Sequence, residues 1–250
     1  MTYSIAFAGK GGTGKTTMAG LMIRYLVENG KTPVLAVDAD ANANLNEVLG
    51  VEVEETLGDA REQMKSGVSA GMTKDVFMEM KIQQAVVESE GFDLIVMGRP
   101  EGAGCYCAAN TLLTQFLDQL IDNYPFVVMD NEAGMEHLSR LTTNNIEDLV
   151  VVSDPTRRGV QAAGRIVQLA DKLKLNIARK RLIVNRVREG QDEDISAAAA
   201  VYGLEVAGTV PEDPEVQEFD LKGKPTVAIS GDNTALRAAY AVFDVMFAAQ

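Results

Sequence analysis

The chain has 250 residues, of which 46% are hydrophobic, so it can bury a sizeable core as one α/β domain spanning residues 1–250. Its 36 acidic residues outnumber the 23 basic ones, and a net charge of −13 gives no electrostatic footprint for nucleic acid or an anionic membrane. Since it has two cysteines, no long apolar stretch and no signal-peptide pattern, we expect a cytoplasmic protein with no nucleic-acid or membrane partner.

Short apolar runs alternate with helix-length segments along the chain. Several runs are continuous, as at residues 126–129, which is typical of strands buried on both faces. The alternation predicts an α/β fold with a mostly parallel central sheet of about seven or eight strands, flanked by helices. Residues 52–71 are the least regular, and we expect an insertion or a mobile cover there. The expected strands are residues 3–8, 34–37, 93–97, 126–129, 149–152, 182–184 and 206–210, and the expected helices are residues 15–29, 75–89, 110–123, 159–173 and 233–248.

The loop after the first expected strand matches G-x-x-x-x-G-K-[ST] at residues 9–16 and opens the first expected helix. Glycines there let backbone N–H groups converge on phosphate oxygens, and the helix N-terminus adds a favourable dipole. We expect Lys15 to reach the β- and γ-phosphates and the Thr16 hydroxyl to ligate Mg²⁺. The sequence therefore predicts a P-loop that binds MgATP and hydrolyses it. Its expected nucleotide-binding residues are Gly11, Gly12, Thr13, Gly14, Lys15, Thr16 and Thr17.

Lys10 follows the first glycine of this loop, and the string GKGGTGKTT resembles the deviant Walker A pattern of a class of dimerising ATPases. That class belongs to the SIMIBI-type P-loop NTPases and includes the nitrogenase iron protein, the Min and ParA positioning ATPases and metal-insertion ATPases. The resemblance implies a homodimer in which Lys10 reaches the partner's nucleotide. There it would stabilise charge on the transferring phosphoryl group, as an arginine finger does. The alternative is a solvated surface lysine.

Two acidic residues follow the expected strand at residues 34–37. Carboxylates at the carboxyl ends of strands in open α/β sheets face the crevice where ligands bind. The resemblance makes this segment switch I, with Asp40 orienting the attacking water and Asp38 holding the hydration shell of Mg²⁺ or Lys15. The alternative is an N-cap for the next helix.

Asp130 closes the apolar run at residues 126–129, which is the Walker B pattern. We expect it to bind Mg²⁺ through water, because this hard cation keeps part of its hydration shell. The residues that follow look like switch II. There Gly134 would let the backbone approach the γ-phosphate and move when that phosphate leaves.

The base of the nucleotide has two candidate contacts late in the chain. Asn185 lies just past an expected strand, where its amide can read both a donor and an acceptor of adenine. The turn that contains Pro211 and Asp213 resembles the second base-contacting segment of the same ATPase class. Ordinary turn chemistry is the alternative at both places.

Cys105 and Cys107 form a C-x-C pair after a glycine-rich segment. Inert buried cysteines fit poorly in so polar a loop, and a disulfide across one residue is strained. One pair offers two thiolates, fewer than the four of a closed tetrahedral site. A two-fold dimer would present the pair twice, because an isologous interface repeats the same patch. Four thiolates suit Zn²⁺, Ni²⁺ or an iron–sulfur cluster.

The surroundings of this pair, with the string DNEAGMEH at residues 130–137, resemble the CooC family along nearly the whole chain. CooC proteins are ATPases that assist nickel insertion into carbon monoxide dehydrogenase, with close relatives serving acetyl-CoA synthase. The resemblance implies a homodimer that shares Ni²⁺ or Zn²⁺ through Cys105 and Cys107, with one of these two enzymes as client. His137, the only histidine, either contacts the metal transiently, couples switch II to the cysteines, or starts a helix.

Three other functions use the same nucleotide motifs. An iron–sulfur electron-transfer protein like the nitrogenase iron protein takes one cysteine from switch II, and here switch II has none. A Min/ParA-type positioning ATPase acts on DNA or membranes, which the acidic composition disfavours, and residues 238–250 lack the basic side chains of an interfacial helix. A small-molecule kinase leaves the cysteine pair unexplained. The sequence therefore favours an ATP-dependent metallochaperone.

Overall fold

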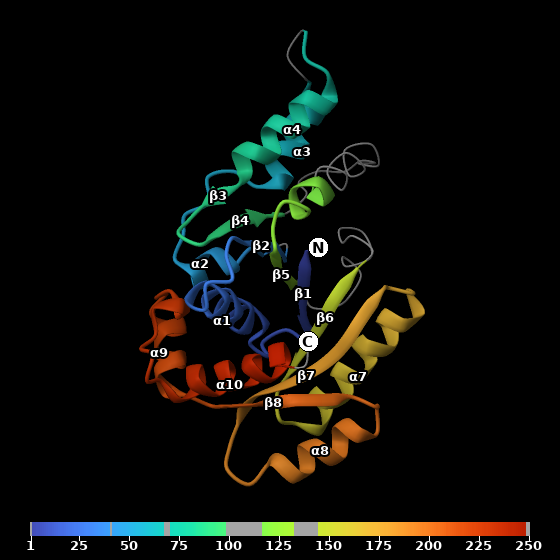
Figure 1. The fold of residues 1–250 in the computed structure, drawn as a ribbon, viewed down its shortest axis with the longest axis vertical. Helices are drawn as coiled ribbons and strands as arrows, with labels where there is room; N and C mark the ends of the chain where they lie inside the picture. Colours follow the sequence, from blue (N-terminus) through green and yellow to red (C-terminus); the bar gives the residue numbers. More distant parts are fainter. Residues whose placement is uncertain (1, 41, 68–70, 99–116, 133–144, 249–250) are drawn as a thin grey trace.

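A computed structural model describes residues 2–40, 42–67, 71–98, 117–132 and 145–248. Its centre is an eight-stranded sheet in the order β3-β4-β2-β5-β1-β6-β7-β8 (Figure 1). Neighbouring strands are parallel except for β3, which has two residues and runs antiparallel to β4. The predicted α/β fold with a mostly parallel sheet is confirmed. The strands are β1 (Tyr3–Gly9), β2 (Val34–Ala39), β3 (Val87–Glu88), β4 (Phe92–Val96), β5 (Phe126–Asn131), β6 (Ile146–Ser153), β7 (Ile177–Val187) and β8 (Glu205–Pro211).

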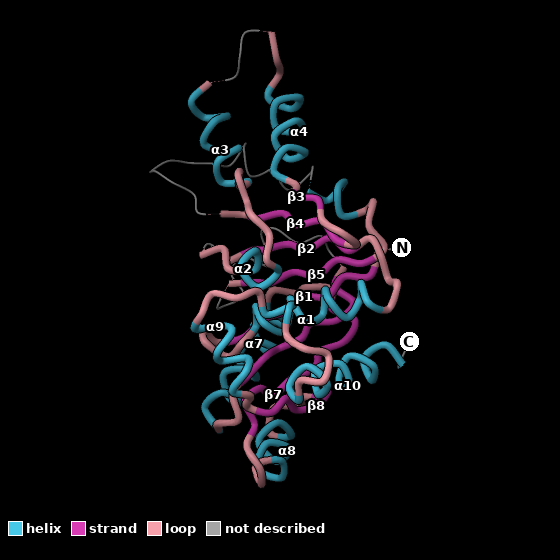
Figure 2. Tube along the Cα trace, turned by 90° about the vertical axis from the view of Figure 1, so that its left-hand side faces the viewer, coloured by secondary structure: helices cyan, strands magenta, loops and turns pink. Residues whose placement is uncertain are grey.

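Helices cover both faces of the sheet, while the pair α3 and α4 projects beyond its β3 edge (Figures 1 and 2). Within the described ranges, no helix is long and apolar enough to cross a membrane. The helices are α1 (Lys15–Glu28), α2 (Leu45–Leu49), α3 (Leu57–Ser66), α4 (Lys74–Ala85), α7 (Arg157–Lys172), α8 (Asp192–Ala200), α9 (Pro214–Leu221) and α10 (Thr234–Ala248), with a 3₁₀ turn, η1 (Thr226–Ala228), before the last.

The continuous apolar runs of the sequence are strands buried on both faces. In β1, Ile5 and Phe7 join a core with α1 and α10, whereas Ala6 and Ala8 join the core on the opposite face, to which α3, α4 and α7 contribute. All four side chains are buried because successive side chains of a strand point to opposite faces. Two apolar layers therefore fix the central strands and the loops at their carboxyl ends.

The expected helix at residues 75–89 is wrong at its C-terminal end, because α4 stops at Ala85 and β3 follows. β3 pairs with β4, and its Val87 is β-branched, which favours a strand. The irregular stretch at residues 52–71 contains a helix, α3. It begins with a capping box in which Thr56 accepts from the Asp59 N–H (3.2 Å) and Asp59 accepts from the Thr56 N–H (2.9 Å).

One strand and one helix differ in length from the segments that the sequence predicts. β7 covers Ile177–Val187, well beyond the expected residues 182–184, because Arg179 and Arg181 in its first half pair with the buried Asp148. The expected helix at residues 110–123 lies largely outside the described part of the chain, where only the helical turn at residues 117–121 belongs to it. The short or polar helices α2, α8 and α9 were not expected.

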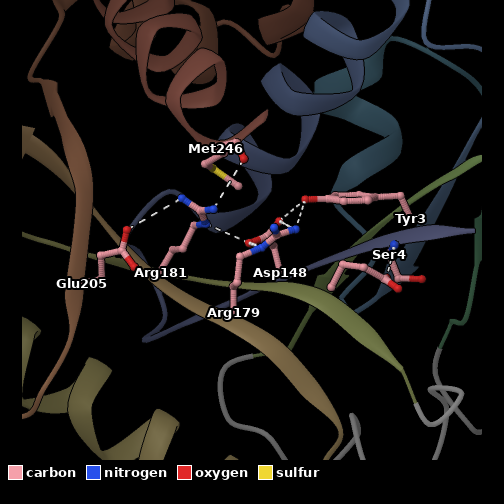
Figure 3. A network of polar contacts seen from close by, with 8 residues as sticks. Tyr3, Ser4, Asp148, Arg179, Arg181, Glu205 and Met246 are labelled. Carbon is pink, nitrogen blue, oxygen red and sulfur yellow. Dashed lines mark hydrogen bonds and ion pairs between the residues drawn. The ribbon is translucent and has the colours of Figure 1, made fainter. Parts of the chain in front are cut away.

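A buried charge cluster joins three strands near their amino ends (Figure 3). Asp148 of β6 is fully buried and accepts from Nε of Arg181 (2.8 Å), from Nε of Arg179 (3.1 Å) and from the Tyr3 hydroxyl. Arg181 is 2% exposed and also donates to the carbonyl oxygen of Met246 in α10 (3.4 Å). One carboxylate thus links β1, β6, β7 and the C-terminal helix.

We expect Asp148→Asn to lower the free energy of unfolding by about 3 kcal/mol, because it removes the buried counter-ion of the Arg181 guanidinium and leaves only the exposed Glu205 at 3.9 Å. Urea denaturation monitored by circular dichroism measures this loss. The matched control is Asp171→Asn, which removes the exposed partner of Lys180 on the same strand β7 and should change stability by no more than about 0.5 kcal/mol. Equal losses in both variants would contradict a special role for Asp148.

Candidate nucleotide site

The loop between β1 and α1 takes its shape from glycines in the left-handed region. Gly12 has φ +78° and Gly14, the residue before α1, has φ +90°. A Cβ atom on Gly14 would lie 2.4 Å from Nδ2 of Asn185, so the neighbouring strand also requires glycine there. The Thr13 hydroxyl donates to the carbonyl oxygen of Lys10 (2.9 Å) and closes the loop on itself. The loop therefore delivers backbone N–H groups at the start of a 14-residue helix, an arrangement that binds phosphate.

The first residues of α1 face the acidic end of β5. Lys15 is 7% exposed, and it and Thr16 lie close enough to the carboxylate of Asp130 to lower the pKa of that group. Asp130 pairs in register with Asp38 of the neighbouring strand β2, so two buried carboxylates lie side by side at the carboxyl edge of the sheet. One ammonium group thus faces two buried acids.

This charge imbalance fits a divalent cation. The Oδ1 atom of Asp130 is buried and has no hydrogen-bond partner among the described residues. Burial raises the pKa of Asp130 to about 7, against the lowering effect of Thr16 and Lys15. A carboxylate oxygen and a hydroxyl at the P-loop are the hard ligands that Mg²⁺ takes. Asp130 and Thr16, two of the predicted magnesium residues, are therefore brought together and suit that ion.

Asp38 has a different set of partners from the predicted one. Its Oδ1 accepts from the Asp40 N–H (3.0 Å) and its Oδ2 from the Leu45 N–H (2.9 Å), so the carboxylate holds the segment after β2. Burial raises its pKa above the ordinary value. Asp40 is half-buried, and its Oδ1 accepts from the N–H (2.8 Å) and the side-chain amide (3.1 Å) of Asn42. The roles of Asp38 at Mg²⁺ and of Asp40 at the attacking water stay predictions.

Two adjoining cavities form one crevice along the P-loop. The larger, of about 350 Å³, lies over Lys15 and Thr16 and is bounded by α2 and the segment after α9. The smaller and more apolar one is bounded by α1, the end of β7, the end of β8 and α9. The crevice therefore has a polar part over the phosphate-binding loop and an apolar part beside it. The residues common to both cavities are Gly14, Thr17, Arg186, Asp220 and Thr226.

The three predicted base contacts all line the apolar cavity. Asn185 donates from Nδ2 to the carbonyl oxygen of Thr13 (2.9 Å), so its side-chain amide links the end of β7 to the P-loop. Asp213 caps α9, accepting from the Glu215 N–H (2.9 Å), and also accepts from Asn233. Both side chains are thus hydrogen-bonded to other parts of the protein at the cavity wall. Direct contact with adenine stays a prediction for Asn185, Pro211 and Asp213.

Sequence reasoning missed several residues that line the crevice. They come from the end of β7, from the turn between β8 and α9, from α9 and from the segment after it. Two of them had a signal in the sequence, since Arg186 directly follows Asn185 and Glu212 lies between Pro211 and Asp213. The missed residues are Arg186, Glu212, Gln217, Asp220 and Lys224.

The remaining predicted residues are only partly described. Lys10 is exposed at the edge of the loop, where a second chain has access to it. Cys105, Cys107, Gly134 and His137 lie outside the described residues. Among the residues that the structure does describe, no three histidine, cysteine or acidic side chains are grouped so as to hold a metal ion.

Comparison with known proteins agrees with this geometry. The family model for the CobQ/CobB/MinD/ParA nucleotide binding domain matches residues 5–227. An uncharacterized ATP-binding protein of Methanocaldococcus jannaschii is 45% identical over 226 residues, which cover 88% of this chain and 89% of the relative. The carbon monoxide dehydrogenase accessory protein CooC of Rhodospirillum rubrum is 31% identical over 235 residues, which cover 88% of this chain and 87% of the relative.

A solved structure matches as well. The septum site-determining protein MinD of Pyrococcus horikoshii, complexed with Mg-ADP, superposes with a TM-score of 0.73 and 26% identity, over 97% of this chain and 94% of that one. The P-loop, the buried acid at the end of β5 and the crevice thus occur in a chain whose relatives bind nucleotide. The chain belongs to the CobQ/CobB/MinD/ParA family of P-loop nucleotide-binding proteins.

Proposed function

We propose that the protein is an ATP-hydrolysing metallochaperone that forms a homodimer with nucleotide and assists nickel insertion into carbon monoxide dehydrogenase or acetyl-CoA synthase. The observation that carries the proposal is the C-x-C pair, Cys105 and Cys107, in a chain that is 31% identical to a carbon monoxide dehydrogenase accessory protein over 88% of its own length and 87% of the relative's. The P-loop crevice supports the ATP-binding half of the proposal.

In the proposed reaction, the phosphates of ATP lie over the N-terminus of α1. Lys15 neutralises the β- and γ-phosphates, while Thr16 and Asp130 hold Mg²⁺, which supplies further positive charge at the phosphate oxygens. Asp40 orients the attacking water. Lys10 of the second copy stabilises the charge that develops on the transferring phosphoryl group.

The proposed cargo site uses both copies. Two C-x-C pairs give four thiolates, which suit Ni²⁺ or Zn²⁺, and a reducing cytoplasm keeps them from forming disulfides. ATP binding and hydrolysis favour different arrangements of the two copies. Because the metal binds the two arrangements with different affinity, hydrolysis releases it to the client enzyme.

A second candidate is a positioning ATPase of the Min/ParA type. It is favoured by the likeness to MinD of Pyrococcus horikoshii, which covers nearly the whole chain. The net charge of −13 and the absence of basic residues from the last turn of α10 speak against an anionic membrane as its target. ATP-dependent co-sedimentation of the protein with anionic lipid vesicles would favour this candidate over the metallochaperone.

Because the carboxyl group of Asp130 is buried, we expect the free energy of unfolding to depend on pH when nucleotide and Mg²⁺ are absent. Its pKa is raised to about 7 in the folded protein, so the folded state binds an extra proton between pH 4 and pH 7 and loses stability as the pH rises. We expect Asp130→Asn to gain about 2 kcal/mol relative to the wild type between pH 5 and pH 8. Urea denaturation in EDTA at both pH values measures this, and a constant difference would contradict it.

Lys10→Ala should leave MgATP binding intact and lower kcat for hydrolysis by about 10²-fold or more, because the group that stabilises the transition state in the second copy is lost. The matched control is Lys172→Ala, which removes an exposed lysine at the far end of α7. Binding by calorimetry and turnover by phosphate release are measured on each variant. Turnover of Lys10→Ala at the wild-type rate would refute the role in trans.

Replacing Cys105 and Cys107 together by Ala should abolish stoichiometric binding of Ni²⁺ or Zn²⁺ and metal-linked dimerisation while leaving nucleotide binding unchanged. Elemental analysis and oligomer mass, with and without ATP, give the result. The Lys172→Ala variant is again the control and should keep the metal. Metal retained by the double variant would refute the cargo site. A broad visible iron–sulfur absorption band in anaerobically purified protein would show that the cysteines hold an iron–sulfur cluster and not nickel.

A further inference from the structure

A bulge at the end of β7 places Arg186 outside the regular strand pairing. Asn185 pairs with Val210 of β8 and Val187 pairs with Pro211, so Arg186 is the extra residue between them. Its φ of +60° lies in the left-handed region, which a side chain as long as arginine rarely adopts. Bulges turn a strand so that a side chain is aimed in a new direction.

The bulge aims Arg186 at the phosphate-binding loop. Its Nη1 donates to the carbonyl oxygen of Gly12 (3.1 Å), while the preceding residue, Asn185, donates to the carbonyl oxygen of Thr13 (2.9 Å). The backbone N–H of Arg186 also donates to Oδ1 of Asn185 (2.9 Å), which ties the Asn185 side chain to the bulged backbone. Two adjacent residues of β7 therefore hold two successive carbonyl groups of the loop.

Fixing these carbonyl groups also fixes the N–H groups of the same peptides. In a planar trans peptide the C=O and N–H bonds point in opposite directions. The Gly12 carbonyl group belongs to the peptide whose Thr13 N–H turns inward to the carbonyl oxygen of Lys10 (3.4 Å). The Thr13 carbonyl group belongs to the peptide of the Gly14 N–H at the start of α1. The hydrogen bonds from Asn185 and Arg186 of β7 thus fix the conformation of the turn that carries Lys10 and the direction of an N–H group at the phosphate site.

We propose that Arg186 is a positioning residue for nucleotide binding: by holding the Gly12 carbonyl group, it keeps the phosphate-binding loop in the conformation that receives the phosphates. Arg186 also lines both cavities of the crevice, where its charge adds to that of Lys15 and Lys224. The inference rests on the proposed MgATP function and adds to it the residue that shapes the loop from a distant strand.

The left-handed backbone at Arg186 provides a clean test, because stability and binding should respond differently. Glycine adopts φ +60° without strain, so Arg186→Gly should fold and melt at a temperature no lower than the wild type. The same substitution removes the guanidinium and should weaken MgADP binding about ten-fold, the loss of one charged hydrogen bond. Arg186→Lys keeps a charged donor and should recover affinity to within about three-fold of the wild type.

The matched control is Arg188→Gly, two residues further along. It removes the same charge, but the Arg188 side chain pairs with Glu212 (2.7 Å) and does not reach the loop. Calorimetric titration with MgADP measures the dissociation constants, and thermal melts report folding. We expect Arg188→Gly to bind within about two-fold of the wild type.

The outcomes separate the two proposals. Wild-type affinity in Arg186→Gly, no recovery in Arg186→Lys, or an equal loss in Arg188→Gly would each overturn the positioning role while leaving the proposed function standing. A wild-type protein that does not bind MgADP would overturn the proposed function, and the positioning role with it.

Discussion

The carboxyl edge of the sheet depends on one buried charge, the carboxylate of Asp130. It lies beside a second buried acid, Asp38, and faces a single ammonium group, that of Lys15. Burying an unbalanced charge is costly, so the surrounding structure either neutralises it with a proton or leaves room for a cation. The sheet brings these groups together because its parallel strands end at the same edge, and the P-loop closes over them from β1. The site is thus arranged around positive charge that arrives with the nucleotide.

The fold was predictable where a strand is apolar on both faces. The runs at β1, β2 and β5 are continuous in the sequence because helices cover both faces of the sheet there. The start of β7 was missed because Arg179 and Arg181 interrupt its apolar pattern, and only the buried Asp148 makes them strand residues. α3 was missed although Thr56 and Asp59 carry a recognisable capping box, because few apolar residues follow it.

The candidate site was predictable where a motif has a fixed spacing. Lys15 and Thr16 follow from the P-loop pattern, and Asp130 follows from an apolar strand closed by an acid. Arg186 did not follow, because its importance comes from a bulge and a left-handed backbone that leave no mark on the residue types. The bonds of Asp38 to the backbone of its own loop were equally hidden, since they depend on how residues 40–45 fold.

The two-residue strand β3 has a consequence for how copies of this chain can meet. An exposed sheet edge invites pairing with another chain, and a very short edge strand removes most of the ladder that such pairing needs. With β3 at the margin and the projecting α3–α4 pair beyond it, the sheet offers little template at this side (Figure 1). Growth of the sheet from one molecule into the next is therefore disfavoured here, which protects the protein from open-ended polymerisation.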